Sequence, residues 1–184
     1  MTHVKIFSAT YFKMIYFNGF SLQNDEEYFK PYLVNSALCV AGFSYGAQKA
    51  FDYVYHSKER IDRLILLSPA FFQTKKKSFI RTQLRYFEAG QEDYVTQFLI
   101  NTAFPARIDL KEYLKIGSKD ELEALLTYKW DEEKMKEVQA RGTVIEVFLG
   151  RKDKIIDAEE TLDFFEPLAT CYSIKEVGHL LLKE

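Results

Sequence analysis

Short apolar runs of strand length recur along the chain, and their alternation with helical patterns constrains the fold more than any other feature. Continuous apolar runs at 36–41, 61–67 and 143–149 suit strands that are buried on both faces of a parallel sheet. The stretches 13–17 and 170–177 have the aromatic and β-branched content of two further strands. Strands that alternate with helices predict an α/β fold with a mainly parallel sheet.

Helical patterns lie between these runs. Residues 24–27, Asn-Asp-Glu-Glu, offer an N-cap and an acidic first turn for a helix that runs toward Leu33. After the run at 36–41, apolar residues recur with the i, i+3, i+4, i+7 spacing of one helical face, at Ala47, Ala50, Phe51 and Val54. A further helix is expected at 157–165. The helix after 36–41 is expected to pack against the sheet.

The stretch 70–137 interrupts this alternation, because it contains helical stretches and no clear strand pattern. A length of 184 residues suits one domain, and 47% hydrophobic residues are enough for its core. We therefore expect a single domain over residues 1–184. In it, a helical cap at about 70–137 is inserted between the core segments 14–69 and 138–184.

The composition argues against several classes of protein. With a net charge of −2, the chain lacks the excess of positive charge that is typical of a nucleic-acid-binding protein. No apolar run approaches the roughly 18 residues that cross a membrane, and Lys5 and Lys13 interrupt any signal peptide. Cys39 and Cys171 lie in strand-like stretches as free thiols, which favours the reducing cytoplasm. We expect a cytoplasmic protein with no nucleic-acid or membrane partner.

Residues 42–46, Gly-Phe-Ser-Tyr-Gly, match the Gly-x-Ser-x-Gly nucleophile elbow. In this motif a tight turn between a strand and a helix strains the serine backbone and exposes the hydroxyl, and small flanking residues leave room for the turn. Here the motif follows the run at 36–41 and opens the amphipathic helix. This context predicts that Ser44 is a catalytic nucleophile.

A serine nucleophile needs a base, and the three histidines leave one candidate. His56 lies on the same predicted helix as Ser44, about 18 Å away at about 1.5 Å per residue. His3 precedes every predicted element. His179 follows the last predicted strand, at the edge where the elbow opens, and is the expected base. The histidines lack metal-ligand spacing and no nucleotide-binding glycine loop is present, so we expect neither a metal nor a cofactor.

The acid that orients the base is expected at the same edge of the sheet. Asp153 directly follows the strand predicted at 143–149 and is the favoured candidate. Asp157 is the alternative acid, although an N-cap of the helix at 157–165 is the simpler interpretation of that residue.

The oxyanion of an acyl-transfer intermediate needs two N–H donors, commonly from the residue after the nucleophile and from the loop after an early strand. Tyr45 is expected to supply the first donor. The turn Gly19-Phe20, after the stretch 13–17, is placed to supply the second, and the glycine permits the turn. An ordinary turn at the end of a strand is the alternative interpretation of Gly19.

The chain resembles the α/β-hydrolase superfamily, in which the nucleophile, acid and base follow one another in the order found here. It resembles most closely the short bacterial pimeloyl-ACP methyl ester esterases of biotin synthesis, over nearly all of the chain from Met14. The stretches that carry this resemblance are Tyr16-Phe-Asn-Gly-Phe20, Gly42-Phe-Ser-Tyr-Gly-Ala47, Leu66-Leu-Ser-Pro69, Ile145-Glu-Val-Phe-Leu-Gly-Arg-Lys-Asp153 and His179-Leu-Leu.

The resemblance implies that the protein hydrolyses the methyl ester of pimeloyl-ACP to pimeloyl-ACP and methanol. It implies a catalytic triad in which Ser44 is the nucleophile, His179 is the base and Asp153 orients the base. It also implies an oxyanion hole formed by the backbone amides of Phe20 and Tyr45. Gly19 and Phe98 are the expected substrate contacts, since Phe98-Leu99 is similar to a Phe-Leu run that contacts the acyl chain in the family's cap.

The chain departs from the family pattern near its start. Asn18 stands where the superfamily commonly has the histidine of a His-Gly turn, and the usual early strands are missing. Residues 1–13 have no counterpart, and Met14 is an alternative start of the native chain.

Basic residues gather at the entrance of the predicted cap, at Lys75, Lys76, Lys77, Arg81 and Arg85. An acyl carrier protein is acidic, so this cluster is a candidate docking site for the carrier, and a solvated charged face is the alternative. Two other functions share the features above: a general short-chain carboxylesterase or thioesterase, and a non-catalytic scaffold that binds an acyl ligand. The sequence does not indicate an oligomeric state.

Overall fold

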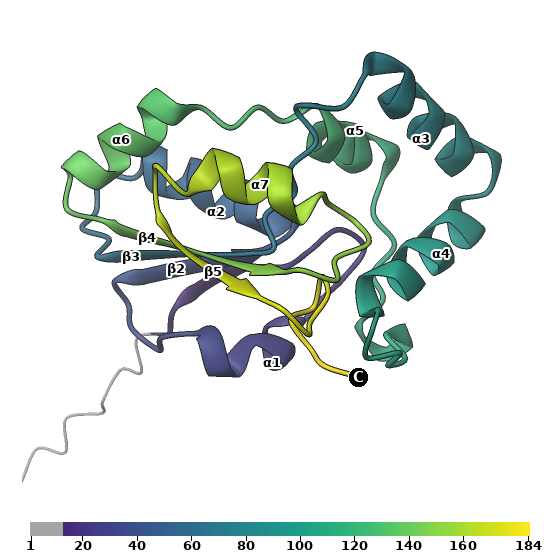
Figure 1. The fold of residues 1–184 in the computed structure, drawn as a ribbon, viewed down its shortest axis with the longest axis horizontal. Helices are drawn as coiled ribbons and strands as arrows, with labels where there is room; N and C mark the ends of the chain where they lie inside the picture. The colour runs from purple at the N-terminus through teal and green to yellow at the C-terminus, as the bar shows by residue number, and fades with distance from the viewer. Residues whose placement is uncertain (1–12) are drawn as a thin grey trace, which may run out of the picture.

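The structure, a computed structural model, describes residues 13–184 and contains one parallel sheet of five strands. The strands lie in the sheet in their order along the chain, and each neighbouring pair is parallel (Figure 1). They are β1 (Ile15–Phe17), β2 (Cys39–Phe43), β3 (Arg63–Leu67), β4 (Val144–Gly150) and β5 (Thr170–Ile174). The predicted α/β fold with a parallel sheet is confirmed. His3, Lys5 and the other residues before position 13 lie outside the described residues.

The largest differences from the predicted strand ends are in two strands. The strand expected at 36–41 begins at Cys39, because Ser36 forms a turn whose carbonyl accepts the Cys39 N–H at 3.0 Å. It continues to Phe43, which pairs with Leu67 of β3. The last strand ends at Ile174 and not at 177, because the chain then turns and the Val177 carbonyl accepts the N–H of Lys152.

Helices cover both faces of the sheet. Figure 1 shows α2 (Tyr45–His56), α6 (Glu132–Ala140) and α7 (Ala158–Phe165) on one face. The opposite face carries α1 (Glu26–Phe29), which continues as a short 3₁₀ turn over Lys30–Tyr32. The helix expected to run toward Leu33 is therefore short. Pro31 lies in the 3₁₀ turn, where its missing N–H prevents a longer α-helix.

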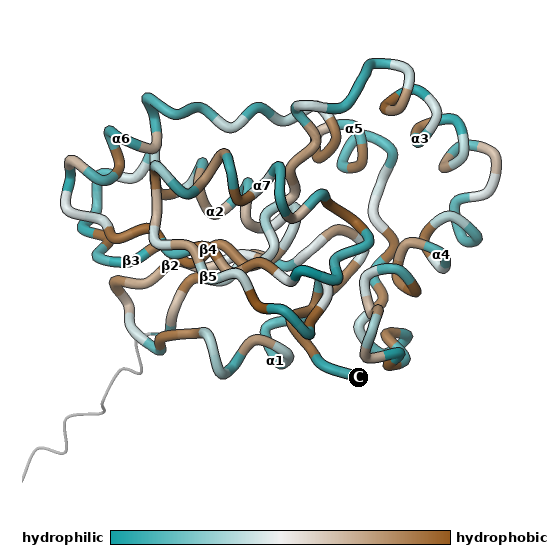
Figure 2. Tube along the Cα trace, in the orientation of Figure 1, coloured by the Kyte–Doolittle hydropathy of each residue, from teal (hydrophilic) through white to brown (hydrophobic). Residues whose placement is uncertain are grey.

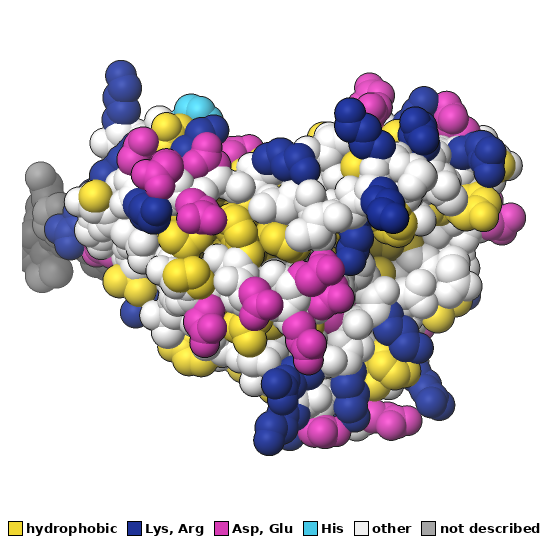
Figure 3. Space-filling model, turned by 45° about the horizontal axis from the view of Figure 1, so that its top comes forward, with side chains coloured by type: hydrophobic (Ala, Val, Ile, Leu, Met, Phe, Trp, Pro, Cys, Tyr) yellow, Lys and Arg dark blue, Asp and Glu magenta, His cyan; other side chains and the backbone are white. Residues whose placement is uncertain are grey.

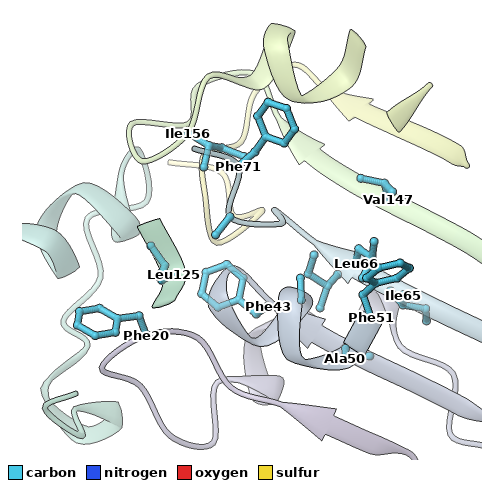
Figure 4. Close-up of a cluster of buried hydrophobic side chains, with 14 of the residues drawn as sticks. Phe20, Phe43, Ala50, Phe51, Ile65, Leu66, Phe71, Leu125, Val147 and Ile156 are labelled. Carbon is cyan, nitrogen blue, oxygen red and sulfur yellow. The ribbon is translucent and has the colours of Figure 1, made fainter. Parts of the chain in front are cut away.

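The core lies between the sheet and α2. All residues of β2 are buried. In Figure 2 the central strands are largely brown, the colour of hydrophobic residues. Figure 4 shows Phe51 of α2 beside Leu66 of β3, with Phe43 between this group and the pair Phe20 and Leu125. The buried core is therefore continuous from the sheet to the segments that lie over the end of β2.

The segment between β3 and β4 is helical. Figure 1 shows α3 (Lys77–Ala89), α4 (Gln91–Ala103) and α5 (Lys119–Thr127) beyond the carboxyl ends of the strands, and we call residues 77–127 the cap. The last helix of the segment, α6, instead packs against α2. From residue 13 onward, no helix combines the length and the apolar character needed to cross a membrane.

Candidate active site

Ser44 lies in a tight turn between β2 and α2. Its backbone has φ of 54° and ψ of −112°, a region that residues other than glycine seldom adopt. The turn is possible because its neighbours are small. A Cβ on Gly46 would lie 2.0 Å from the Phe17 carbonyl oxygen, and one on Gly42 would lie 2.2 Å from the carbonyl oxygen of Gly46. The geometry is that of a nucleophile elbow.

A chain of hydrogen bonds joins Ser44, His179 and Asp153. The Nε2 atom of His179 lies 2.9 Å from Ser44 Oγ, and Nδ1 lies 2.6 Å from Asp153 Oδ2. The side chains of His179 and Asp153 are fully buried. A proton on Nδ1, held by the carboxylate, leaves the lone pair of Nε2 free to accept the serine hydroxyl proton.

The backbone fixes the Asp153 carboxylate. Its Oδ1 accepts the N–H of Ile155 at 2.7 Å and that of Ile156 at 3.1 Å. One carboxylate oxygen is thus held by the loop after β4, and the other is directed at the imidazole. This arrangement fixes the orientation of the ring as well as its tautomer.

Asp157, the alternative acid, and His56, the histidine that was excluded as the base, both lie away from Ser44. Asp157 is the N-cap of α7, and its Oδ1 accepts the N–H groups of Glu159 and Glu160 at 3.1 and 3.0 Å. His56 is at the exposed end of α2, where Nδ1 lies 2.7 Å from the Asp52 carbonyl oxygen. Neither residue belongs to the hydrogen-bonded chain that contains Ser44.

Ser68 holds the loop that carries His179, a role that the sequence did not reveal. The buried Ser68 hydroxyl donates a hydrogen bond of 2.7 Å to the His179 carbonyl oxygen. The only signal for it in the sequence is position, since Ser68 directly follows β3 at the edge of the sheet where Ser44 follows β2. Ser68 therefore links the end of β3 to the backbone of His179.

The turn after β1 packs against the residue that precedes Ser44. A Cβ on Gly19 would lie 2.6 Å from the Phe43 ring, and the Gly19 N–H donates to Asp25 Oδ2 at 2.7 Å. The Gly19 amide is therefore occupied. The N–H groups of Phe20 and Tyr45 donate no hydrogen bond to another element within the part of the chain that the structure describes. These two groups remain available to an oxyanion.

A cleft of about 650 Å³ lies between α3, α4, α5 and the loop after Asp153. Phe98 lines it and contacts the Phe20 ring edge-on, with 5.6 Å between the ring centroids. Lys154 and Ile155 bring its wall next to Asp153. Ser44 is only 1% exposed.

Gln48 fastens the segment between β3 and β4 to α2. Its Nε2 donates to the carbonyl oxygens of Ala70, at 3.0 Å, and Leu125, at 3.1 Å. The same Ala70 oxygen accepts the indole N–H of Trp130 at 2.9 Å. The start of the segment and α5 are therefore both joined to the helix that begins next to Ser44. Apart from a polar residue on α2, nothing in the sequence indicates this contact.

The predicted basic cluster gathers at the start of α3. Lys75 pairs with Glu160 at 3.1 Å. The other four residues are exposed, and in the described part of the chain no carboxylate lies within 4.0 Å of their charged nitrogens: Lys76, Lys77, Arg81 and Arg85. In Figure 3, dark blue basic side chains and some magenta acidic ones lie in the upper right of the view, the side on which Figure 1 places α3.

The two cysteines are poor candidates for chemistry. Burial raises the thiol pKa of Cys39 and of Cys171 to about 11, so that both stay protonated at neutral pH. Residues 13–184 contain no group of three potential metal-binding side chains.

No protein-family model and no curated protein matches the chain. Solved structures do. A hydrolase from Oleispira antarctica has a TM-score of 0.65 at 11% identity, and the superposed region covers 92% of this chain and 85% of the hydrolase. MenH from S. aureus has a TM-score of 0.61 at 15% identity, covering 94% and 88%. BioG from Haemophilus influenzae has a TM-score of 0.57 at 13% identity, covering 91% and 88%. At these identities the similarity is one of fold.

Proposed function

This chain has the α/β-hydrolase fold, and we propose that it is a serine ester hydrolase. The observation that supports this proposal best is the buried hydrogen-bonded chain from Ser44 Oγ through His179 to Asp153. It gives the serine a base within reach, and it gives the base a fixed tautomer.

In the first half of the reaction, Ser44 Oγ attacks the ester carbonyl carbon while His179 Nε2 takes the hydroxyl proton. The carbonyl oxygen becomes an oxyanion, which the N–H groups of Phe20 and Tyr45 stabilise. The imidazolium then gives its proton to the leaving alkoxide. The alcohol departs, and the acyl group stays on Ser44 as an ester.

In the second half, water attacks the acyl-enzyme and gives a proton to His179 Nε2. The second tetrahedral intermediate collapses, the proton returns to Ser44 Oγ, and the carboxylic acid is released. Asp153 remains ionised throughout and stabilises the imidazolium. The net reaction consumes one ester and one water and yields one acid and one alcohol.

The proposed substrate is the methyl ester of pimeloyl-ACP, which would yield pimeloyl-ACP and methanol for biotin synthesis. The resemblance of the sequence to esterases with this substrate supports it. The cleft beside Asp153 supports it as well, because an acyl chain needs an apolar lining, and Phe98, Leu125 and Ile155 contribute one.

The proposed partner is the acyl carrier protein, which would dock on the exposed basic residues of α3. Carrier proteins are acidic, and opposite charges favour both the encounter and its orientation. The cluster lies on the cap helix that also lines the cleft, so a docked carrier would hold its acyl arm near the entrance.

Reversal of charge in this cluster is expected to raise KM for an acyl-ACP ester about tenfold and to leave a small p-nitrophenyl ester unaffected. The double variant Lys76→Glu, Arg85→Glu removes two cations that have no carboxylate partner among the described residues. Lys58→Glu, on an exposed loop at the opposite end of the strands, is the matched control. Equal losses on both substrates would reject the docking site.

The reaction is tested by incubating the protein and its Ser44→Ala variant with pimeloyl-ACP methyl ester and following the mass of the carrier. We expect the loss of one methyl group, dependent on Ser44. No demethylation, with Ser44 still labelled by a fluorophosphonate, would retain a serine hydrolase and reject this substrate in favour of a general carboxylesterase or thioesterase. Neither turnover nor labelling would favour a scaffold that binds an acyl ligand.

A further inference from the structure

A buried carboxylate lies behind the turn that carries the Phe20 N–H. Asp25 has no exposed surface, and its Oδ2 accepts the Gly19 N–H at 2.7 Å. Its own N–H donates to the Asn18 side-chain oxygen at 3.2 Å. The two hydrogen bonds join both ends of the segment 18–25 and close it into a loop.

These contacts orient the peptide that connects Gly19 to Phe20. Asp25 holds the Gly19 N–H, and the Gly19 carbonyl oxygen accepts the N–H of Leu22 at 3.3 Å. In a trans peptide, the carbonyl of Gly19 and the N–H of Phe20 point in opposite directions. When the carbonyl is held inside the loop, the Phe20 N–H is directed out of it.

The loop is strained and needs such support. Ser21 and Asn24 have φ of 57° and 54°, in the left-handed region that residues with a side chain seldom adopt. Backbone in this region persists only where surrounding contacts enforce it. Without the Asp25 acceptor, the Gly19 N–H would also be buried without a partner.

The Asp25 carboxylate does not cap the helix that follows it. It stands at the N-cap of α1 but makes no side-chain hydrogen bond to that helix, which has only four residues. Burial raises the pKa of Asp25 to about 7, although the Gly19 N–H and the Tyr16 hydroxyl oppose this shift. The titratable groups near it are Tyr16 on β1 and Glu26 on its own helix. A group that is so unfavourable to bury indicates a use outside the stability of the fold.

We propose that Asp25 is a positioning residue for ester hydrolysis, which accepts the Gly19 N–H and thereby keeps the Phe20 N–H directed at the oxyanion site beside Ser44. This inference rests on the proposed function and extends it to a residue that touches no reacting atom.

The kinetic test compares three variants on a p-nitrophenyl ester, with rates expressed per active site. Asp25→Ala removes the acceptor, and we expect kcat to fall about 10- to 100-fold with KM within about threefold, since an oxyanion donor acts on the transition state. Asp25→Asn keeps an acceptor oxygen and is expected to retain kcat within about threefold. The control is Asp52→Ala, which removes a carboxylate that accepts the Tyr128 hydroxyl away from the site. We expect it to retain kcat within about threefold.

Active sites are counted by the final extent of fluorophosphonate labelling at Ser44, so that unfolded protein does not count as slow enzyme. If Asp25→Ala is not recovered folded, Asn18→Ala loosens the same loop from its other end and is expected to lower kcat in the same direction. Unchanged kcat per site in the folded variant, or equal losses in Asp25→Ala and Asp25→Asn, would overturn the proposal.

A second measurement does not depend on activity. The folded protein holds the Asp25 proton up to about pH 7, whereas the unfolded chain releases it near its ordinary pKa. Ionisation between these values therefore favours the unfolded state, and the wild-type Tm should fall relative to that of Asp25→Asn as the pH rises from about 4 to about 7. Parallel Tm curves would contradict the buried carboxylate on which the proposal depends.

The outcomes separate this proposal from the proposed function. If wild-type protein gives neither Ser44-dependent turnover nor labelling, the proposed function fails and the positioning role fails with it. If wild-type protein is active and Asp25→Ala is equally active per site, only the role of Asp25 is rejected.

Discussion

Replacement of His179 by alanine is expected to lower kcat for an ester by about a millionfold, the size of effect seen when the base of a serine triad is removed. The imidazole is the group within hydrogen-bond distance of Ser44 Oγ that can accept its proton. Without it, the serine hydroxyl stays protonated and attacks esters poorly. Initial rates with a p-nitrophenyl ester measure the loss, after active protein has been separated from any aggregate.

The matched control is His56→Ala. This imidazole lies at the exposed end of α2 and interacts with the carbonyl of Asp52 one turn earlier. We expect its kcat to stay within about twofold of wild type, because surface changes away from a site have small effects. A His179→Ala variant that keeps a tenth of the wild-type rate would be incompatible with the proposed mechanism.

The sequence predicted those features of the fold that depend on local signals. Buried strands are short continuous apolar runs, and the elbow is a contiguous motif whose glycines meet a steric need seen at Gly46. His179 and Asp153 could be named because parallel strands bring the loops after them to one edge of the sheet. The catalytic roles of these residues stay predictions until the variants are measured.

The contacts that support the site could not be predicted, because they join residues far apart in the chain. Ser68 reaches across 111 residues to the carbonyl of His179, and Gln48 reaches across 77 to that of Leu125. The stretch 24–27 predicted an N-cap, and Asp25 stands at that position, yet its carboxylate accepts the Gly19 N–H and makes no hydrogen bond to α1. Local patterns identify which residues are polar, whereas the fold decides what they contact.

The cap gives a similar example on a smaller scale. The resemblance in sequence concerns the pair Phe98-Leu99, but adjacent residues on a helix point about 100° apart. The structure directs Phe98 into the cleft beside Asp153, and Leu99 lines a separate depression on the other side of α4. Only one of the two residues can contact an acyl chain in that cleft.

The choice between the two candidate acids is tested by the pair Asp153→Asn and Asp157→Asn. We expect Asp153→Asn to lower kcat about 10⁴-fold. In that variant the asparagine oxygen can still accept the N–H groups of Ile155 and Ile156, so the amide would be presented to His179 Nδ1. An N–H donor at this place favours the tautomer with the proton on Nε2, which cannot accept the proton of Ser44.

Asp157→Asn changes the same functional group four residues away, with a different expected result. Asparagine is about as good an N-cap as aspartate, so α7 should keep its first turn and the free energy of unfolding should change by less than about 1 kcal/mol. We expect kcat within about twofold of wild type, because Asp157 does not contact His179. The reverse pattern, a large loss in Asp157→Asn and a small one in Asp153→Asn, would assign the acid to Asp157 and contradict the hydrogen-bonded chain in the structure.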